Sequence, residues 1–236
     1  MTLIADIVND ITANPGPALF LDTCILLDVV RAPLRNKPDE VRFGRIFLDA
    51  AQKIPKNIHL LIPSPVMTEW DTHILERENE CRTAVDACNA VSAICGHLAL
   101  PAVAVLPAAV LTLPEVLRQL STDLLAACVT IDHDADALGR AVNRIIASTH
   151  PVKRPDSKGA KDAVILEHAV QMTGQLRIAG FAGDCLFVSS NTKDYAAPGS
   201  TNLNLQLVPS FNHVDLGYAV SLTDAHAILI AGGWIP

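Results

Sequence analysis

The chain of 236 residues has few aromatic and few charged side chains, and it lacks the patterns that mark several common protein classes. Only 18% of the residues are charged and 50% are hydrophobic, which excludes a mainly disordered chain. No uninterrupted apolar run reaches about 18 residues, so we expect no membrane span. Residues 1–6 do not show the basic and then apolar order of a secretory signal. We therefore expect a cytoplasmic protein with reduced thiols.

The six cysteines include no CxxC pair, which argues against a zinc ribbon or a thioredoxin-type site. Cys81, Cys88 and Cys95 recur every seven residues. This spacing predicts that they lie on the inward stripe of one helix, where cysteine acts as a small apolar residue. A glycine-rich phosphate loop of the Walker type is also missing, which removes the common nucleotide-binding loop from consideration.

An excess of positive charge is missing as well, because the formal net charge is -7. This acidity argues against a protein that binds nucleic acid through a broad basic surface. It leaves open an enzyme that reaches nucleic acid through metal ions.

Short apolar runs alternate with helical patterns along the chain, which predicts an α/β fold with a mainly parallel sheet. The expected strands are residues 18–21, 59–62 and 185–188, with an alternating edge strand at 203–208. The expected helices are residues 42–53, 64–100, 117–145 (one helix or a broken pair), 159–173 and 221–231. We expect a single domain over residues 1–236, with a helical elaboration at about 80–150 and a C-terminal extension at about 211–236.

Acidic residues stand near the ends of the expected strands. Asp22 follows the first strand, Glu69 lies in the helix after the second, and Asp194 follows the third. Asp162 lies near the start of the helix that precedes the third strand. In open parallel sheets, ligands bind at the carboxyl ends of the strands, so these acids could share one crevice. Several carboxylates in one crevice repel each other unless a cation lies among them, and hard oxygen ligands select Mg²⁺ or Mn²⁺.

Four segments that carry these acids resemble, in order, the four motifs of PIN-domain nucleases, a family that includes the toxin ribonucleases of toxin–antitoxin pairs. The segments are residues 19–23 (LFLDT), 63–69 (PSPVMTE), 161–165 (KDAVI) and 188–195 (VSSNTKDY). The resemblance implies a three-layer α/β/α fold with a central parallel sheet. It also implies phosphodiester hydrolysis with bound Mg²⁺ or Mn²⁺, leaving a 5′-phosphate and a 3′-hydroxyl. Asp22, Glu69, Asp162 and Asp194 are then the catalytic and metal-binding quartet, and Asn191 falls where many members have another Asp.

Further residues near the motifs are candidates for contact with the substrate. Thr23 or Ser190 could bond a phosphate or a ligand carboxylate, and Asn191 is a candidate contact to the substrate. A basic rim of Lys158, Lys161 and Lys193, with Lys153 and Arg154 close by, suits a phosphate backbone. The alternative for this basic cluster is an ordinary solvated loop.

The sequence thus predicts a metal-dependent nuclease, specifically an endoribonuclease, with DNA as the alternative substrate. The resemblance adds two expected partners, an antitoxin-like protein and a second copy of the chain. Two other functions stay open: a PIN-like module that binds RNA or protein with little or no catalysis, and a different Mg²⁺-dependent phosphoester hydrolase.

Overall fold

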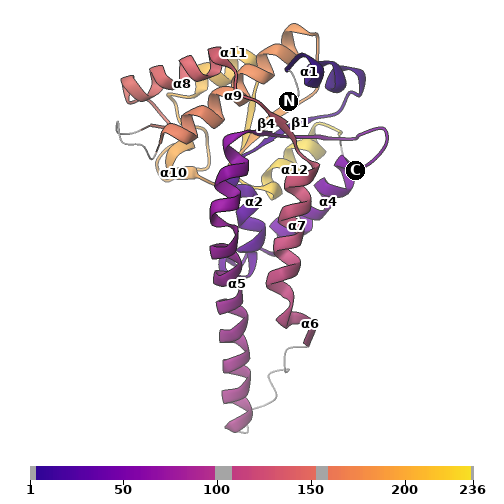
Figure 1. Ribbon diagram of the computed structural model, residues 1–236, viewed down its shortest axis with the longest axis vertical. Helices are drawn as coiled ribbons and strands as arrows, with labels where there is room; N and C mark the ends of the chain where they lie inside the picture. Colours follow the sequence, from indigo (N-terminus) through magenta and orange to yellow (C-terminus); the bar gives the residue numbers. More distant parts are fainter. Residues whose placement is uncertain (1–3, 99–107, 153–158, 235–236) are drawn as a thin grey trace.

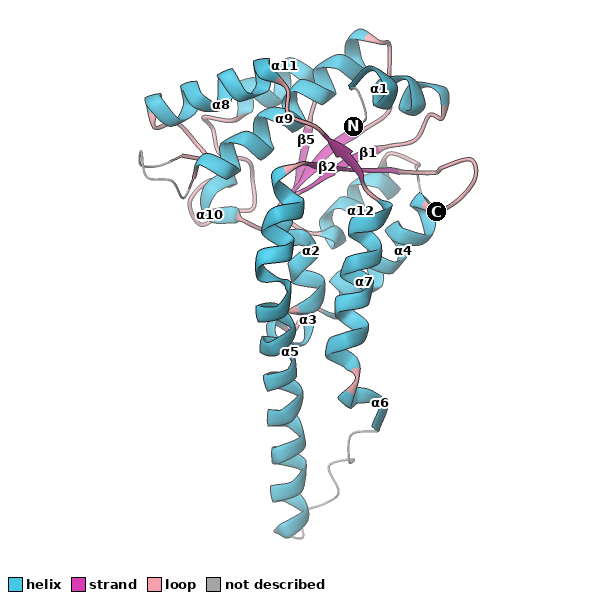
Figure 2. Ribbon diagram, viewed as in Figure 1, coloured by secondary structure: helices cyan, strands magenta, loops and turns pink. Residues whose placement is uncertain are grey.

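The computed structural model describes residues 4–98, 108–152 and 159–234. Its centre is a parallel sheet of five strands in the order β3-β2-β1-β4-β5 (Figure 2). The strands are β1 (Ala18–Leu21), β2 (His59–Pro63), β3 (Val129–Ile131), β4 (Cys185–Val188) and β5 (Gly217–Ala219). Because all five are parallel, their carboxyl ends lie along the same edge, and Asp22 follows the central strand.

Helices cover both faces of the sheet (Figure 1). On one face lie α2 (Thr23–Val30), α4 (Pro38–Ala51), α5 (Pro65–His97), α7 (Leu113–Ala127) and α12 (Leu222–Ala231). On the other lie α1 (Ile4–Ala13), α8 (Ala135–Ala147), α9 (Ala160–Ile178) and α11 (Val208–Val214). The short helices are α3 (Ala32–Arg35), α6 (Ala108–Leu111) and α10 (Thr192–Tyr195). The three-layer α/β/α fold with a parallel sheet is confirmed.

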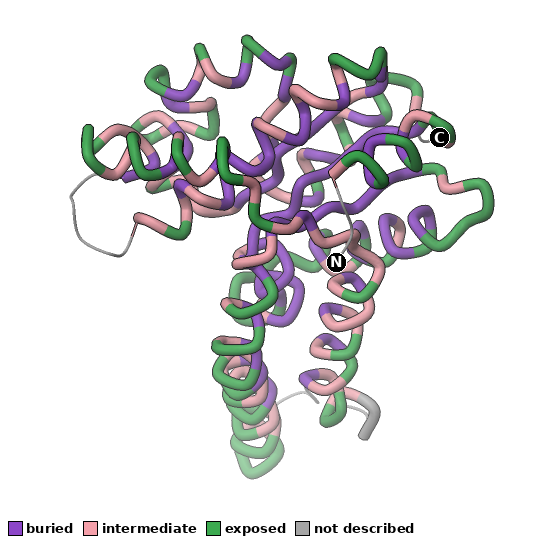
Figure 3. The backbone as a smooth tube through the Cα atoms, turned by 45° about the horizontal axis from the view of Figure 1, so that its top comes forward, coloured by how far each residue is buried: buried purple, intermediate pink, exposed green. Residues whose placement is uncertain are grey.

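The central strands are the most deeply buried part of the chain (Figure 3). All residues of β1, β2 and β4 are buried, as the continuous apolar runs predict for strands that are covered on both faces. Phe20 and Phe187 pair in register on adjacent strands, and both are fully buried. The sheet is therefore a rigid base for the residues that follow its strands.

The edges of the sheet differ from the prediction. Residues 203–208 form no strand: Leu203 makes an isolated bridge to Ala196, and α11 begins at Val208. The edge strands are instead β5 and β3, each only three residues long. Strands this short carry too few residues to show a period, and β3 interrupts the pattern interpreted as a long helix or a broken pair. The helix expected to end before Gly174 runs on to Ile178.

Helix α5 departs from the body of the fold in its second half. Cys81 and Val85 are buried as the seven-residue spacing predicts, but Cys88 is exposed. Figure 1 shows the end of α5 projecting beyond the other helices, and Val91 and Leu98 are exposed among the residues that the structure describes. The predicted inward stripe is therefore wrong beyond Val85. None of the described helices is long and apolar enough to span a membrane.

The regions expected to elaborate the fold contribute to its layers. Residues 80–150 contain the edge strand β3 and also α8, which packs along α9. The segment after Phe211 contains β5 and α12, and α12 packs on α4. The elaboration is therefore not purely helical. That the chain is a single domain stays a prediction.

Candidate active site

The four predicted acids come from four elements and face a common space. Asp22 ends β1, Glu69 lies in the first turns of α5, Asp162 in the first turn of α9 and Asp194 in α10. The pKa of Asp162 rises to about 8, because burial disfavours its charged form and the carboxylates of Asp22, Asp194 and Glu69 repel it. Repulsion from all three shows that the chain brings these groups together from distant segments.

Asp22 is held by hydrogen bonds on both carboxylate oxygens. Its Oδ1 accepts the backbone N–H of Thr23 at 2.7 Å, where it caps the start of α2. Its Oδ2 accepts the hydroxyl of Ser189 at 2.6 Å and the thiol of Cys24 at 3.1 Å. Burial raises the pKa of Asp22 and Glu69 raises it further, while these three hydrogen bonds oppose the rise. The carboxylate is therefore fixed in direction but lacks a positive partner among these contacts.

Glu69 is positioned by its neighbours on both sides of the crevice. Its Oε2 accepts the hydroxyl of Thr23 at 2.7 Å. Its Oε1 lies 3.5 Å from Nζ of Lys161, whose side chain is 60% exposed. Solvent weakens an ion pair of this kind, so Lys161 offsets only part of the negative charge.

Asp162 and Asp194 are supported through the loop after β4. The Asn191 side chain hydrogen-bonds to the carboxyl group of Asp162 and opposes the rise of its pKa. The hydroxyl of Tyr195, which is fully buried, donates to the backbone carbonyl of Asp162 at 3.1 Å. The backbone carbonyl of Asp194 lies 3.1 Å from Nδ1 of His150. The loop thus ties the start of α9 to α10.

The predicted substrate contacts fall into three groups. Thr23 bonds the carboxylate of Glu69, which is one of the two roles expected of it, and the side chain of Asn191 bonds the carboxyl group of Asp162. Ser190 lies at the rim with its backbone N–H donating to Sγ of Cys24 at 3.1 Å, and Lys193 is exposed on α10. Lys158, with Lys153 and Arg154, lies outside the described residues.

Sequence reasoning missed three residues that organise this crevice: Ser189, Cys24 and Tyr195. The register between β1 and β4 pairs Leu21 with Val188, so the next residues, Asp22 and Ser189, lie side by side. Ser189 is fully buried and also accepts the backbone N–H of Asn191 at 3.2 Å. Knowledge of the strand register would have revealed its role, since parallel neighbours end at the same edge.

The chemistry of these side chains fits a hard divalent cation. Among the described residues, no three acidic, histidine or cysteine side chains are already arranged as a metal cage. The donors are nevertheless carboxylate oxygens, which Mg²⁺ and Mn²⁺ prefer, and their mutual repulsion is what a bound cation would relieve. That Asp22 and Asp162 hold the ion, with Glu69 and Asp194 completing its shell, stays a prediction.

The comparison with protein families agrees with this arrangement. A family model described as PIN domain matches residues 19–195, which is well over half of the chain and includes all four acids. The chain therefore belongs to the PIN-domain family, whose members are generally nucleases that use divalent metal ions. Neither the curated proteins nor the solved structures give a significant match.

Proposed function

We propose that this protein is a metal-dependent endoribonuclease whose catalytic groups are Asp22, Glu69, Asp162 and Asp194. The observation that carries the proposal is that four acids from four separate elements meet at the carboxyl edge of the sheet, where burial and the other three carboxylates raise the pKa of Asp162. A fold does not keep such a cluster for stability, because each like charge disfavours the others. The cluster is useful when it binds a cation, and this agrees with the family.

The residues of the chain divide the work between holding the ion and orienting the acids. Asp22 and Asp162 would hold Mg²⁺ or Mn²⁺, and the ion would supply an activated water and neutralise phosphate oxygens. Ser189 fixes the Asp22 carboxylate, and Thr23 fixes Glu69. Lys161 at the rim would attract the phosphate backbone.

Other features of the proposal rest on the resemblance to toxin ribonucleases. They are RNA in preference to DNA, an antitoxin-like partner and a homodimer. A cytoplasmic location rests instead on the N-terminal residues and the cysteine pattern. The non-catalytic module is the second candidate. Asn191 favours it, because this residue stands where many members of the family have a further acidic ligand.

The decisive experiment compares cleavage of end-labelled RNA and DNA with Mg²⁺, with Mn²⁺ and with EDTA. We expect metal-dependent cleavage of RNA that disappears in Asp22→Ala, because the acid at the end of the central strand is lost. Asp86→Ala is the matched control, since Asp86 is an exposed acid on the outer half of α5. Tight RNA binding without cleavage would support the module, and turnover of small phosphoesters alone would support another hydrolase.

A further inference from the structure

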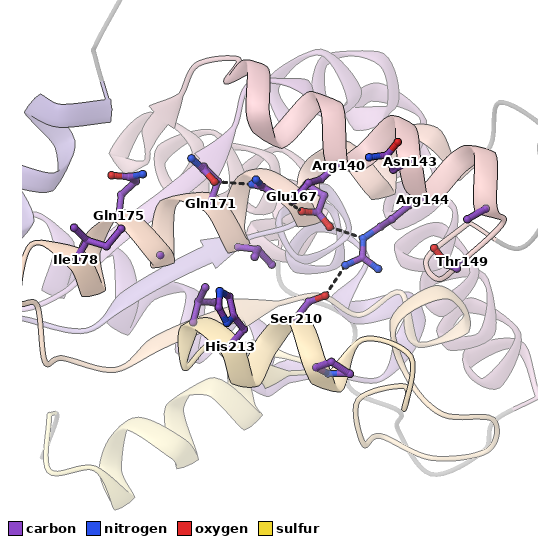
Figure 4. Close-up of a pocket in the computed structure, with 15 residues that line it drawn as sticks. Arg140, Asn143, Arg144, Thr149, Glu167, Gln171, Gln175, Ile178, Ser210 and His213 are labelled. Atoms are coloured by element: carbon purple, nitrogen blue, oxygen red, sulfur yellow. Dashed lines mark hydrogen bonds and ion pairs between the residues drawn. The ribbon is translucent and has the colours of Figure 1, made fainter.

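A groove lies on the outer layer of the fold, away from the carboxylate cluster. It has a volume of about 810 Å³ and is formed by α8, α9, α11 and Thr149 (Figure 4). Figure 4 shows the side chains of Arg140, Asn143 and Arg144 on one wall, with Ser210 and His213 opposite. Nothing in the proposed catalytic mechanism uses these side chains.

The two arginines of the groove are fixed by a buried acid. Glu167 is 2% exposed and accepts Nε of Arg140 at 2.8 Å and Nε of Arg144. Arg140 also donates to Gln171 at 2.6 Å, and Arg144 donates to Ser210 at 2.8 Å. Guanidinium groups held in this way lose little freedom when they bind a ligand, which favours tight binding.

The lining of the groove carries more positive than negative charge. Two guanidinium groups face one carboxylate in it, although the whole chain has a formal charge of -7. The side chain of Arg140 is 40% exposed, so an anion can approach it from solvent. The rest of the lining offers amide and aliphatic groups, which can hydrogen-bond and pack against bases and sugars. These further groups are Asn143, Gln171, Gln175, Ala147, Val170, Ile178 and Val214.

The groove connects to the carboxylate cluster through His150. Arg144 donates to the backbone carbonyl of His150 at 2.9 Å, and Nδ1 of His150 lies 3.1 Å from the carbonyl of Asp194. A second hollow of about 820 Å³ lies beside this link and is lined by His150, Thr192, Lys193 and the loop 196–201. Thr149 and His150 therefore separate two hollows, one at α10 and one at the arginines.

We propose that the groove between α8, α9 and α11 is an accessory binding site for the substrate, which takes the single-stranded nucleic acid beyond the bond that is cut. The strand would leave the carboxylates over Lys193 and His150, and its phosphates would reach the exposed side of Arg140, which Arg144 and Glu167 help to position. The proposal rests on the proposed nuclease function. An acidic peptide shares the anionic chemistry, but the connection to the carboxylates favours a strand that touches both sites.

The test compares a substrate that is too short to reach the groove with one that reaches it. The substrates are a dinucleotide and a fluorescent oligonucleotide of about 12 nucleotides. Asn143→Asp places a negative charge on an exposed groove residue, and Asn89→Asp makes the same change on the projecting half of α5. We expect Asn143→Asp to weaken binding of the long strand about 3–10-fold and to leave kcat/KM for the dinucleotide unchanged. Asn89→Asp should change neither.

Arg140→Ala should weaken binding of the long strand about tenfold and should flatten its salt dependence, because a phosphate contact is lost. Thermal melts accompany both variants, and Asn143→Asp keeps the proposal testable if Arg140→Ala fails to fold. Binding is measured by anisotropy in EDTA, so it does not depend on cleavage. If the enzyme cuts RNA but Asn143→Asp binds the long strand like wild type, the accessory site is overturned and the nuclease stands.

Other outcomes of the binding and cleavage assays also distinguish the groove proposal from the nuclease proposal. Charge-sensitive binding of the long strand by a protein that cuts nothing would support the groove and reject the nuclease. A wild-type protein that binds no strand, or that binds poly-glutamate through Arg140 instead, would overturn the groove as a nucleic-acid site.

Discussion

Two acids on α9, Asp162 and Glu167, lie within two turns of each other and have opposite surroundings. Glu167 is almost fully buried and bonds two guanidinium groups, from Arg140 and Arg144. Asp162 is half-buried and faces three other acids, so its pKa rises to about 8. Within the described part of the chain, Glu167 has two positive partners, whereas the side chains that act most strongly on Asp162 are three carboxylates and the amide of Asn191.

This difference is what we expect between an acid that stabilises the fold and an acid of the proposed catalytic site. A buried charge is stable only when it is paired, and the chain provides that pair for Glu167. At Asp162 the chain instead collects further carboxylates, whose mutual repulsion a bound cation would relieve. The predictions below test this contrast by changing one acid at a time.

The largest effect is expected from Asp162→Asn. The amide has the same shape but loses the charge that would help to hold the ion, so cleavage should fall about a thousandfold. Initial rates on labelled RNA with saturating Mn²⁺ measure the loss. The matched change on the same helix is Glu167→Gln, assayed at a temperature where it is folded. At saturating RNA, where weaker binding in the groove does not limit turnover, its rate should stay within a few-fold of wild type. Equal losses in both variants would mean that Asp162 has no special role.

The free energy of unfolding should fall in Glu167→Gln and not in Asp162→Asn, which is the reverse of the order expected for cleavage. Glu167→Gln removes the negative charge that faces two arginines, one of which is only 13% exposed, so we expect the free energy of unfolding to fall by about 3 kcal/mol. Chemical denaturation in EDTA measures this value. Asp162→Asn should not lower stability under the same conditions. A Glu167→Gln variant as stable as wild type would show that the arginines do not need this acid.

The sequence was informative about these two acids to different degrees. Asp162 could be predicted because the apolar run of β4 and the helix before it place the acid near a strand end. The pairing of Glu167 could not, because Arg140 and Arg144 come from α8, in the region interpreted as an elaboration of the fold. Periodicity shows which face of a helix is apolar, but it does not show which helix packs against it.

Periodicity also could not show how long each strand is or where a packed helix face ends, which explains the other differences between the predicted and the observed fold. The buried strands were predictable from their continuous apolar runs, whereas β3 and β5 are too short to show a pattern. The sequence predicted that the stripe of Cys81 and Cys88 is buried along its whole length, but α5 extends past its neighbours and Cys88 is exposed. The period of a stripe does not show where the neighbouring helices end.

A smaller effect is expected at Ser189. Ser189→Ala removes the 2.6 Å hydrogen bond that orients Asp22. We therefore expect the affinity for the metal ion, or the cleavage activity, to fall about 10–100-fold. A titration of cleavage rate against Mn²⁺ concentration separates a loss of metal affinity from a lower maximal rate. Ser190→Ala is the comparison, because Ser190 was the predicted contact and is the half-buried neighbour of Ser189. A larger loss in Ser190→Ala would favour the sequence-based assignment.

The smallest effect is the pH dependence of stability in EDTA. Since folding raises the pKa of Asp162 from about 3.8 to about 8, the folded state binds the proton more tightly than the unfolded state. The stability from this group is therefore fully present below about pH 4 and is lost as pH rises to about 8. Thermal melts across this range should show a steeper alkaline decline in wild type than in Asp162→Asn. Added Mn²⁺ should remove the difference by raising the wild-type melting temperature at alkaline pH. Parallel curves for the two proteins would mean that the other acids do not act on Asp162, and the contrast with Glu167 would then fail.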